Sequence, residues 1–322
     1  MRQFAKPTIV VSKCLEFDAC RYNGEMIPDV TIRNLQPFVT FIPVCPEVEI
    51  GLGTPRETIR IVEENGENRL VQPSTREDVT EKMEQFSNDF LQTIPDVDGF
   101  ILKNRSPSCG TRDVKIYSGF EKAPAKGKGA GLFGGAVVKK FSHLPIEEEG
   151  RLSNFIIREH FFTRLFTIAY YKMIKHNKNM KELVSFQSDN KYLFMAYNQV
   201  KQKELGRIIA NHKNEKIEVV FENYEKTLYE LFMRAPRYTS NVNVCEHIFG
   251  YFKTKLKKQE KDHFIELLQK YAEKKIPLSS LLTILKSWAI RFDEKYLLRQ
   301  TYFEPYPEAL VEISDSGKGR DY

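Results

Sequence analysis

Hydrophobic positions in the first half of the chain fall in short uninterrupted runs, whereas in the second half they recur at helical spacing. The runs Thr8–Ser12, Phe38–Val44 and Gly99–Leu102 are rich in Val, Ile and Phe and are bounded by Pro, Gly or Ser. Such runs are typical of strands that are buried on both faces of a parallel sheet. We therefore expect an α/β fold in the first half.

The segment Thr75–Leu91 has the spacing of an amphipathic helix, with Val79 and Phe86 among the apolar residues of one face. Ser74 or Thr75 would serve as its N-cap. A helix that connects two strands of this kind forms a β-α-β unit. The predicted fold is thus a Rossmann-like parallel sheet.

The second half is expected to be entirely helical. Leu152–Ile174 is apolar on nearly all sides and would be a central helix. One of the later helices carries Cys245 and His247 among apolar residues, so both are expected in the core. The further predicted helices cover residues 191–212, 217–234, 243–256, 261–274 and 278–291.

Composition changes near Leu144–Gly150, where Gly, Pro and strand-like runs give way to Lys, Phe, Tyr and Leu. We predict an α/β domain over residues 1–146 and an all-helical domain over residues 151–312. Residues 313–322 are polar and contain glycine, which is typical of a disordered tail.

Charge also differs between the halves. Residues 1–150 contain 19 Lys and Arg against 22 Asp and Glu, a net charge of −3, and residues 151–322 contain 30 against 21, a net charge of +9. An excess of basic residues in one half indicates a polyanionic partner, because Lys and Arg contacts to phosphates dominate nucleic-acid affinity. The alternative is an ordinary solvated helical surface.

The chain has features expected of a cytoplasmic protein with reduced thiols. It has no run of about 18 uncharged apolar residues, and its first residues lack the apolar core of a signal peptide. Its five cysteines are an odd number in a chain of 322 residues, too long to depend on disulfides. Thiols that serve a metal or catalysis are therefore expected.

Three of the cysteines come directly after predicted strands. Cys14, Cys45 and Cys109 lie just beyond the first, second and third apolar runs. Because the carboxyl ends of parallel strands meet at one edge of a sheet, the three thiols are expected to meet there. The sequence therefore predicts a metal site. Cys20 could supply a fourth thiolate, zinc bound by three or four cysteines is an alternative, and unrelated buried thiols are another.

The run Gly129–Gly134 fits the G-x-G-x-x-G pattern of dinucleotide sites. However, no strand is predicted before it and no acidic residue stands after it at the usual spacing, so we do not predict a dinucleotide site. A glycine-rich loop beside the cysteines, or a simple connection, is expected instead.

Four ordered motifs resemble the thiouracil-desulfidase family, formerly the domain of unknown function numbered 523. They are Ser12-Lys-Cys-Leu15, Arg21-Tyr-Asn-Gly24, Cys45-Pro-Glu47 and Ser106-Pro-Ser-Cys-Gly110. The second half resembles the helical domain of unknown function numbered 1722, through residues 193–199, 243–252 and 299–307. The pairing is similar to two-domain desulfidases that act on 4-thiouridine in tRNA.

The resemblance implies a [4Fe–4S] cluster held by Cys14, Cys45 and Cys109, with one iron left open. Glu47 stands two residues after a predicted ligand, and the resemblance implies that it is the acid/base. A serine of the Ser106-Pro-Ser108 segment would assist it. We favour Ser106 over Ser108, because Ser106 is not adjacent to a ligand.

The resemblance also implies a reaction, in which 4-thiouridine in tRNA is hydrolysed to uridine and sulfide without electron transfer. Arg21 and Tyr22 would line the pocket, the aromatic ring stacking on a base and the cation meeting phosphate, or would pack a turn. Two other functions remain open. One is desulfuration of free thiouracil, and the other is non-catalytic RNA binding with a structural metal site. The pattern gives no oligomeric state.

Overall fold

The computed structural model describes residues 2–120 and 124–312 and divides into two compact units. Of the described residues, the first unit contains those up to 169 together with 309–312, and the second spans residues 170–308. The division falls inside helix α6 (Phe155–Asn177). The predicted tail at residues 313–322 lies outside the described residues.

The first unit contains a four-stranded sheet of order β2-β1-β6-β9, in which all pairings are parallel. The strands are β1 (Thr8–Ser12), β2 (Thr40–Val44), β6 (Gly99–Leu102) and β9 (Ile146–Glu148). Every residue of β6 is buried, as expected for a sheet covered on both faces. The predicted Rossmann-like α/β fold is confirmed.

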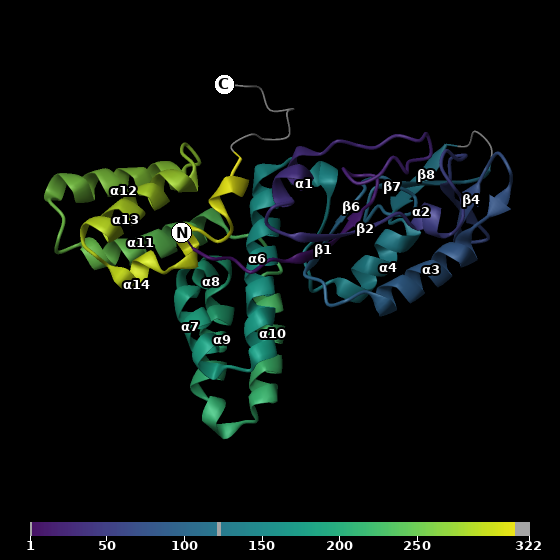
Figure 1. The fold of residues 1–322 in the computed structure, drawn as a ribbon. Helices are drawn as coiled ribbons and strands as arrows, with labels where there is room; N and C mark the ends of the chain where they lie inside the picture. Colours follow the sequence, from purple (N-terminus) through teal and green to yellow (C-terminus); the bar gives the residue numbers. More distant parts are fainter. Residues whose placement is uncertain (1, 121–123, 313–322) are drawn as a thin grey trace. The chain divides into compact units, whose positions relative to one another are not determined.

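Helices pack on this sheet through aromatic contacts. Figure 1 shows α3 (Thr80–Thr93) and α4 (Leu132–Phe141) side by side below the strands. Phe90 of α3 contacts Phe133 of α4 with ring centroids 5.8 Å apart, and Phe141 of α4 lies 5.1 Å from Phe100 of β6. The other helices that lie wholly in this unit are α1 (Val30–Leu35), α2 (Pro46–Glu49) and α5 (Glu149–Leu152).

A second, five-stranded sheet of order β5-β4-β3-β7-β8 was not expected from the sequence. Its strands are β3 (Arg60–Glu64), β4 (Glu67–Gln72), β5 (Glu77–Asp78), β7 (Val114–Tyr117) and β8 (Ala125–Gly129). The prediction that no strand precedes the Gly129–Gly134 run is therefore wrong, since β8 ends at Gly129.

The predicted start of the 75–91 helix is also wrong, because Glu77 and Asp78 pair with β4 and the helix begins at Thr80. The Asp78 carboxylate accepts a hydrogen bond from the Thr80 amide at 2.9 Å. Thr75 instead donates to the Gln72 side chain at 2.8 Å.

The second half is helical, as predicted, with some different boundaries. The helices are α7 (Met180–Asp189), α8 (Lys191–Tyr197), α9 (Gln199–Ala210), α10 (Ile217–Leu231), α11 (Tyr238–Phe249), α12 (Lys258–Ala272), α13 (Leu278–Arg291) and α14 (Lys295–Leu298). The expected helix over 191–212 is divided at Asn198, whose side chain caps α9 by accepting from the Val200 and Lys201 amides. Helix α7 was not expected.

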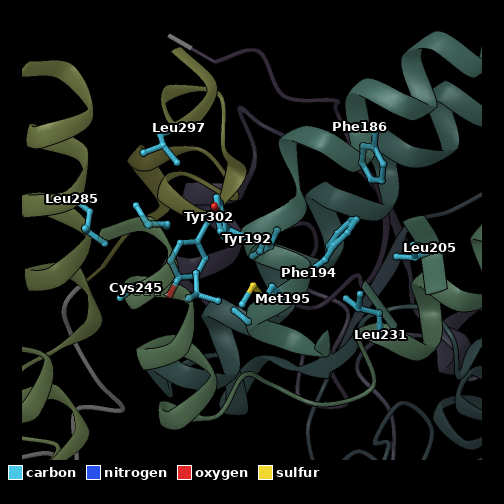
Figure 2. Packing of buried hydrophobic residues seen from close by; sticks show 14 of the residues in the cluster. Phe186, Tyr192, Phe194, Met195, Leu205, Leu231, Cys245, Leu285, Leu297 and Tyr302 are labelled. Atoms are coloured by element: carbon cyan, nitrogen blue, oxygen red, sulfur yellow. Dashed lines mark hydrogen bonds between the residues drawn. The ribbon is translucent and has the colours of Figure 1, made fainter. Parts of the chain in front are cut away.

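The core of the helical unit contains residues from the motifs at positions 243–252 and 299–307. Figure 2 shows Cys245 beside Tyr302, and the Cys245 Sγ lies 3.9 Å from the tyrosine hydroxyl. The expectation that Cys245 is a core residue is confirmed, whereas His247 is exposed and that part of the prediction is wrong. Within the described chain, no helix has the length and apolar character needed to span a membrane.

His160 in α6 provides a test of how this helix is buried. Burial lowers the pKa of His160 to about 4, and the neighbouring Arg164 adds to the decrease. Since the unfolded state would bind a proton first, the free energy of unfolding should fall as the pH drops from about 6.5 to 4, by no more than about 3 kcal/mol. Urea denaturation of His160→Gln should show a shallower fall over this range. His176→Gln, at an exposed position of α6, should match the unmodified protein; equal slopes for all three proteins would contradict the prediction.

Candidate functional site

The parallel pairing of β2, β1 and β6 brings three chain segments to the same edge of the sheet. Ser12 and Val44 are paired at the ends of β1 and β2, and the Lys13 amide continues the ladder by donating to the Val44 carbonyl at 2.8 Å. On the other side, the Lys103 amide donates to the Ser12 hydroxyl at 2.9 Å. Cys14, Cys45 and the loop that contains Cys109 therefore leave three adjacent strands.

The three thiols are near enough to influence one another's ionisation. Burial raises the pKa of Cys14 to about 12, and the nearby Cys45 adds to the increase. Burial also raises the pKa of Cys109 strongly, with Cys14, Glu47 and Cys45 acting in the same direction, while a hydrogen bond with Ser12 opposes it. Without a metal, Cys14 and Cys109 hold their protons, so metal binding would release them.

Cys20 is a further thiol next to this group, and it is buried. Burial raises the pKa of Cys20 to about 12, and the neighbouring Cys45 raises it further. Its backbone carbonyl lies 3.8 Å from the Cys45 Sγ as a hydrogen-bond acceptor. The structure thus places Cys20 beside one of the predicted ligands.

Among residues 2–120 and 124–312, no three or more His, Cys, Asp or Glu side chains converge closely enough to hold a single metal ion. Thiolates are the usual ligands of an iron–sulfur cluster. Three cysteines from three adjacent strand ends, with Cys45 and Cys109 buried and Cys14 half-buried, fit that donor set.

Glu47 lies between the cysteines and two serines, on the short helix α2 that begins directly after Cys45. Its Oε1 accepts a hydrogen bond from the Ser108 hydroxyl at 2.6 Å and lies 3.5 Å from the Ser106 hydroxyl. The two serine hydroxyls are 2.9 Å apart. The closer partner of Glu47 is therefore Ser108, although the sequence favoured Ser106.

Arg56 completes the surroundings of Glu47 and was missed by the sequence reasoning. Its Nε donates to the Glu47 Oε2 at 2.9 Å, and its Nη2 donates to the same oxygen. The signal that could have found it is weak: a lone arginine after the turn-forming stretch Gly51–Pro55, nine positions beyond Glu47.

The loop that carries Cys109 is held in place by Ser106 and by the glycine-rich segment. The Ser106 hydroxyl accepts from the amides of Ser108 and Cys109 at 3.3 and 3.1 Å. The amides of Gly131 and Gly134 donate to the carbonyls of Gly110 and Ser108 at 2.7 and 2.9 Å. The Gly129–Gly134 run thus supports the cysteine loop, which is one of the two uses that the sequence left open.

Two glutamates from the segment where the composition changes fix both ends of the same loop. The Glu148 carboxylate accepts from the Thr111 and Arg112 amides at 2.7 and 3.2 Å. The Glu149 carboxylate accepts from the Asn104 amide at 2.7 Å and pairs with the Lys103 ammonium. Both glutamate side chains are buried, so the loop is anchored by charge-assisted bonds.

Arg21 and Tyr22 lie in a turn that contacts Arg56. The guanidinium of Arg21 lies 5.4 Å from the centre of the Tyr22 ring, which is 42% exposed. The Tyr22 carbonyl accepts from the Arg56 amide at 2.8 Å, which ties the turn to the site. An exposed aromatic ring with a cation is compatible with either interpretation of this turn.

The fold and these side chains define an α/β protein with a thiol-rich site, and a carboxylate beside it, at the carboxyl edge of its parallel strands. A family model described as 2-thiouracil desulfurase matches residues 9–149, and one described as a protein of unknown function (DUF1722) matches residues 191–307. The chain belongs to the 2-thiouracil desulfurase family and carries a DUF1722 region in its second half. The resemblance stated from the motifs is confirmed.

Individual proteins are similar to different parts of the chain. The uncharacterized protein YbbK of Bacillus subtilis is 36% identical over 118 residues, which are 34% of this chain and 77% of the relative. The uncharacterized protein YbgA of Escherichia coli is 23% identical over 156 residues, 48% of this chain and 92% of the relative. Among solved structures, the [4Fe–4S]-dependent thiouracil desulfidase TudS is 26% identical with a TM-score of 0.36, over 46% of this chain and 93% of TudS.

The support of the cysteine loop by α4 can be tested with two neighbouring glycines. A Cβ on Gly134 would meet the carbonyls of Cys109 and Gly110, whereas one on Gly135 would have Ala130 as its neighbour at an ordinary 3.4 Å. Gly134→Ala should lower the free energy of unfolding by about 1–3 kcal/mol. Gly135→Ala should leave it unchanged or raise it by up to about 1 kcal/mol. Urea denaturation of the metal-free proteins measures both, and equal stabilities would show that the contact is unimportant.

Proposed function

We propose that the protein is a [4Fe–4S]-dependent desulfidase that hydrolyses the carbon–sulfur bond of a thiouracil-type base, with 4-thiouridine in tRNA as its substrate. Cys14, Cys45 and Cys109 would hold the cluster. The observation that carries the proposal is the hydrogen bond between Glu47, two residues from Cys45, and Ser108, the neighbour of Cys109. Membership of the 2-thiouracil desulfurase family supports the reaction class.

The cluster, when bound through three thiolates, supplies an iron without a protein ligand that acts as a Lewis acid toward the soft sulfur of a thiocarbonyl. Overall, one water adds and hydrogen sulfide leaves. The oxygen of water forms the new carbonyl, the carbon–sulfur bond breaks, and no electrons are gained or lost. The protein must therefore bind the base, hold a water molecule and move protons.

Glu47 is placed to move those protons. Its Oε1 is in hydrogen-bond contact with a hydroxyl that can both donate and accept, so a proton can pass between the carboxylate and Ser108. We assign Glu47 as the base that takes a proton from the attacking water and returns it to the departing sulfur. Ser108 holds the carboxylate in position, and Ser106, bonded to Ser108 at 2.9 Å, supports it.

The charge of the helical half supports tRNA as the form in which the base arrives. Residues 151–322 have a net charge of +9, whereas residues 1–150 have a net charge of −3. A free base has no phosphates for a basic surface to bind, whereas an RNA has one for each nucleotide. A 4-thiouridine in a folded RNA would have to leave its stack to reach the site.

The role of Glu47 predicts a large and specific loss of rate. Glu47→Gln should lower kcat for sulfide release by about 100- to 10,000-fold, because the amide cannot accept the proton of water. Glu49→Gln, at an exposed position of the same helix, is the matched control and should keep full activity. Sulfide release by the anaerobically reconstituted proteins measures both. Iron content must be equal in all three, and an active Glu47→Gln protein would refute the assignment.

The tRNA substrate predicts a salt dependence that a free base would not show. Raising the salt from about 50 to about 200 mM should lower kcat/KM for 4-thiouridine-containing tRNA by at least about 10-fold, since released counterions drive RNA binding. The value for free 4-thiouracil should change little. Sulfide release from the two substrates, measured side by side, tests this. Turnover of the free base with none on tRNA would indicate the free thiobase as substrate, and loaded protein inactive on both would indicate a structural metal site.

A further inference from the structure

We propose that Arg56 is the positioning residue of the site: it fixes one oxygen of Glu47 to the backbone framework, so that the other oxygen is presented to Ser108 and water. This inference rests on the proposed function for its catalytic meaning. Its geometric part stands independently, because it concerns only the contacts between Arg56, Glu47 and the surrounding backbone.

The contacts of Arg56 with Glu47 are unusually one-sided. An arginine facing a carboxylate commonly forms two parallel bonds, one to each oxygen. Here both Nε and Nη2 donate to Oε2 alone, and the distance for Nε is 2.9 Å. Oε1 is left to the Ser108 hydroxyl at 2.6 Å. The two oxygens therefore have different tasks, one structural and one available for proton transfer.

The guanidinium is itself anchored to main-chain carbonyls. Its Nη1 donates to the carbonyls of Cys20 and Gly53 at 3.0 and 2.9 Å. The Arg56 amide donates to the Tyr22 carbonyl at 2.8 Å. The arginine side chain is only 4% exposed and that of Glu47 only 13%. Because the guanidinium is fixed by the backbone on the side away from Glu47, it determines the orientation of the carboxylate.

The Cys20 carbonyl connects this arrangement to a predicted ligand. It accepts from Arg56 Nη1 at 3.0 Å and lies 3.8 Å from the Cys45 Sγ. The orientation of the acid/base and the position of the Cys45 sulfur thus share one main-chain atom. A carbonyl is present whatever side chain occupies position 20, so this connection does not require the Cys20 thiol.

Lysine cannot replace Arg56 in this role. A guanidinium is planar and donates in fixed directions, so it can reach Oε2 and two carbonyls at once, whereas an ammonium is a point charge on a flexible stem. Arg56→Lys therefore keeps the charge beside Glu47 and removes the geometry. The variant distinguishes orientation from simple electrostatic attraction.

The first experiment is a double-mutant cycle on the rate. Arg56→Lys should lower kcat for sulfide release from free 4-thiouracil by about 10- to 100-fold, as expected when a reacting group is misplaced by about 1 Å, while KM and iron content stay unchanged. In a Glu47→Gln background the same substitution should cause almost no further loss, because Arg56 acts through Glu47. If the two substitutions lower kcat independently, so that their fold-losses multiply in the double variant, the proposal is overturned. It is also overturned if Arg56→Lys keeps the kcat of the unmodified protein.

The second experiment needs neither activity nor metal. Urea denaturation of the metal-free full chain with Arg56→Lys, with Glu47→Gln and with both should show a double variant that loses less than the sum of the single losses. The matched control is Arg69→Lys, which weakens the ion pair of Arg69 with Asp78 on the second sheet and should combine additively with Glu47→Gln. Additive losses at Arg56 would overturn the positioning role.

The two experiments separate the two proposals. If the unmodified protein releases no sulfide from either the tRNA or the free base, the proposed function fails. Coupled stabilities of Arg56 and Glu47 would still support the positioning of Glu47 in that case. If the protein is active and either the rates or the stabilities of Arg56 and Glu47 are uncoupled, the positioning role fails and the proposed function stands.

Discussion

The pairing of β1 with β2 and β6 is the constraint on which the site depends. Parallel strands that are hydrogen-bonded in register must end at one edge, and Ser12 is paired with Val44 while its hydroxyl receives the Lys103 amide. The three chain segments therefore leave the sheet next to one another, at the same edge. The hydrogen-bonded register of these strands therefore fixes where the three segments begin, and thereby the positions of the cysteines.

The segments beyond the strand ends are held by polar groups rather than by apolar packing. The loop from Lys103 to Arg112 is bound at its ends by Glu149 and Glu148 and at its centre by Ser106 and the amides of α4. Glu47 is held between Arg56 and Ser108 in the same way. Since removing one partner leaves a buried polar group unsatisfied, these contacts depend on one another. Precise placement of the site is thus a property of the whole network.

Sequence patterns predicted the parts of this structure that are set by local hydrophobicity. The strands β1, β2 and β6 are continuous apolar runs, and α13 matches its predicted range of residues 278–291. The second sheet was missed because its strands lack such runs: β8 is a Lys and Gly segment, and β4 is buried only in its last three residues.

The candidate site was predicted to the extent that chain position alone determines proximity. Cys14, Cys45 and Glu47 lie close to strand ends in the sequence, so the sheet brings them together. Arg56 reaches Glu47 only because the intervening turn folds back, and no spacing rule indicates that. Which of Ser106 and Ser108 lies closer to Glu47 is likewise decided by side-chain direction. The loop conformation sets that direction, and sequence adjacency does not.

The amides of Ser108 and Cys109 have a further consequence, which concerns electrons. Backbone donors that point at the sulfur atoms of a cluster stabilise its reduced form, because they compensate the added negative charge. Here both amides already donate to the Ser106 hydroxyl. These two amides are therefore engaged by a hydroxyl and are not available to the Cys109 sulfur. In the proposed holoprotein, compensation of added negative charge at that sulfur would come instead from side chains such as the Ser108 hydroxyl, whose Oγ lies 3.8 Å from the Cys109 Sγ.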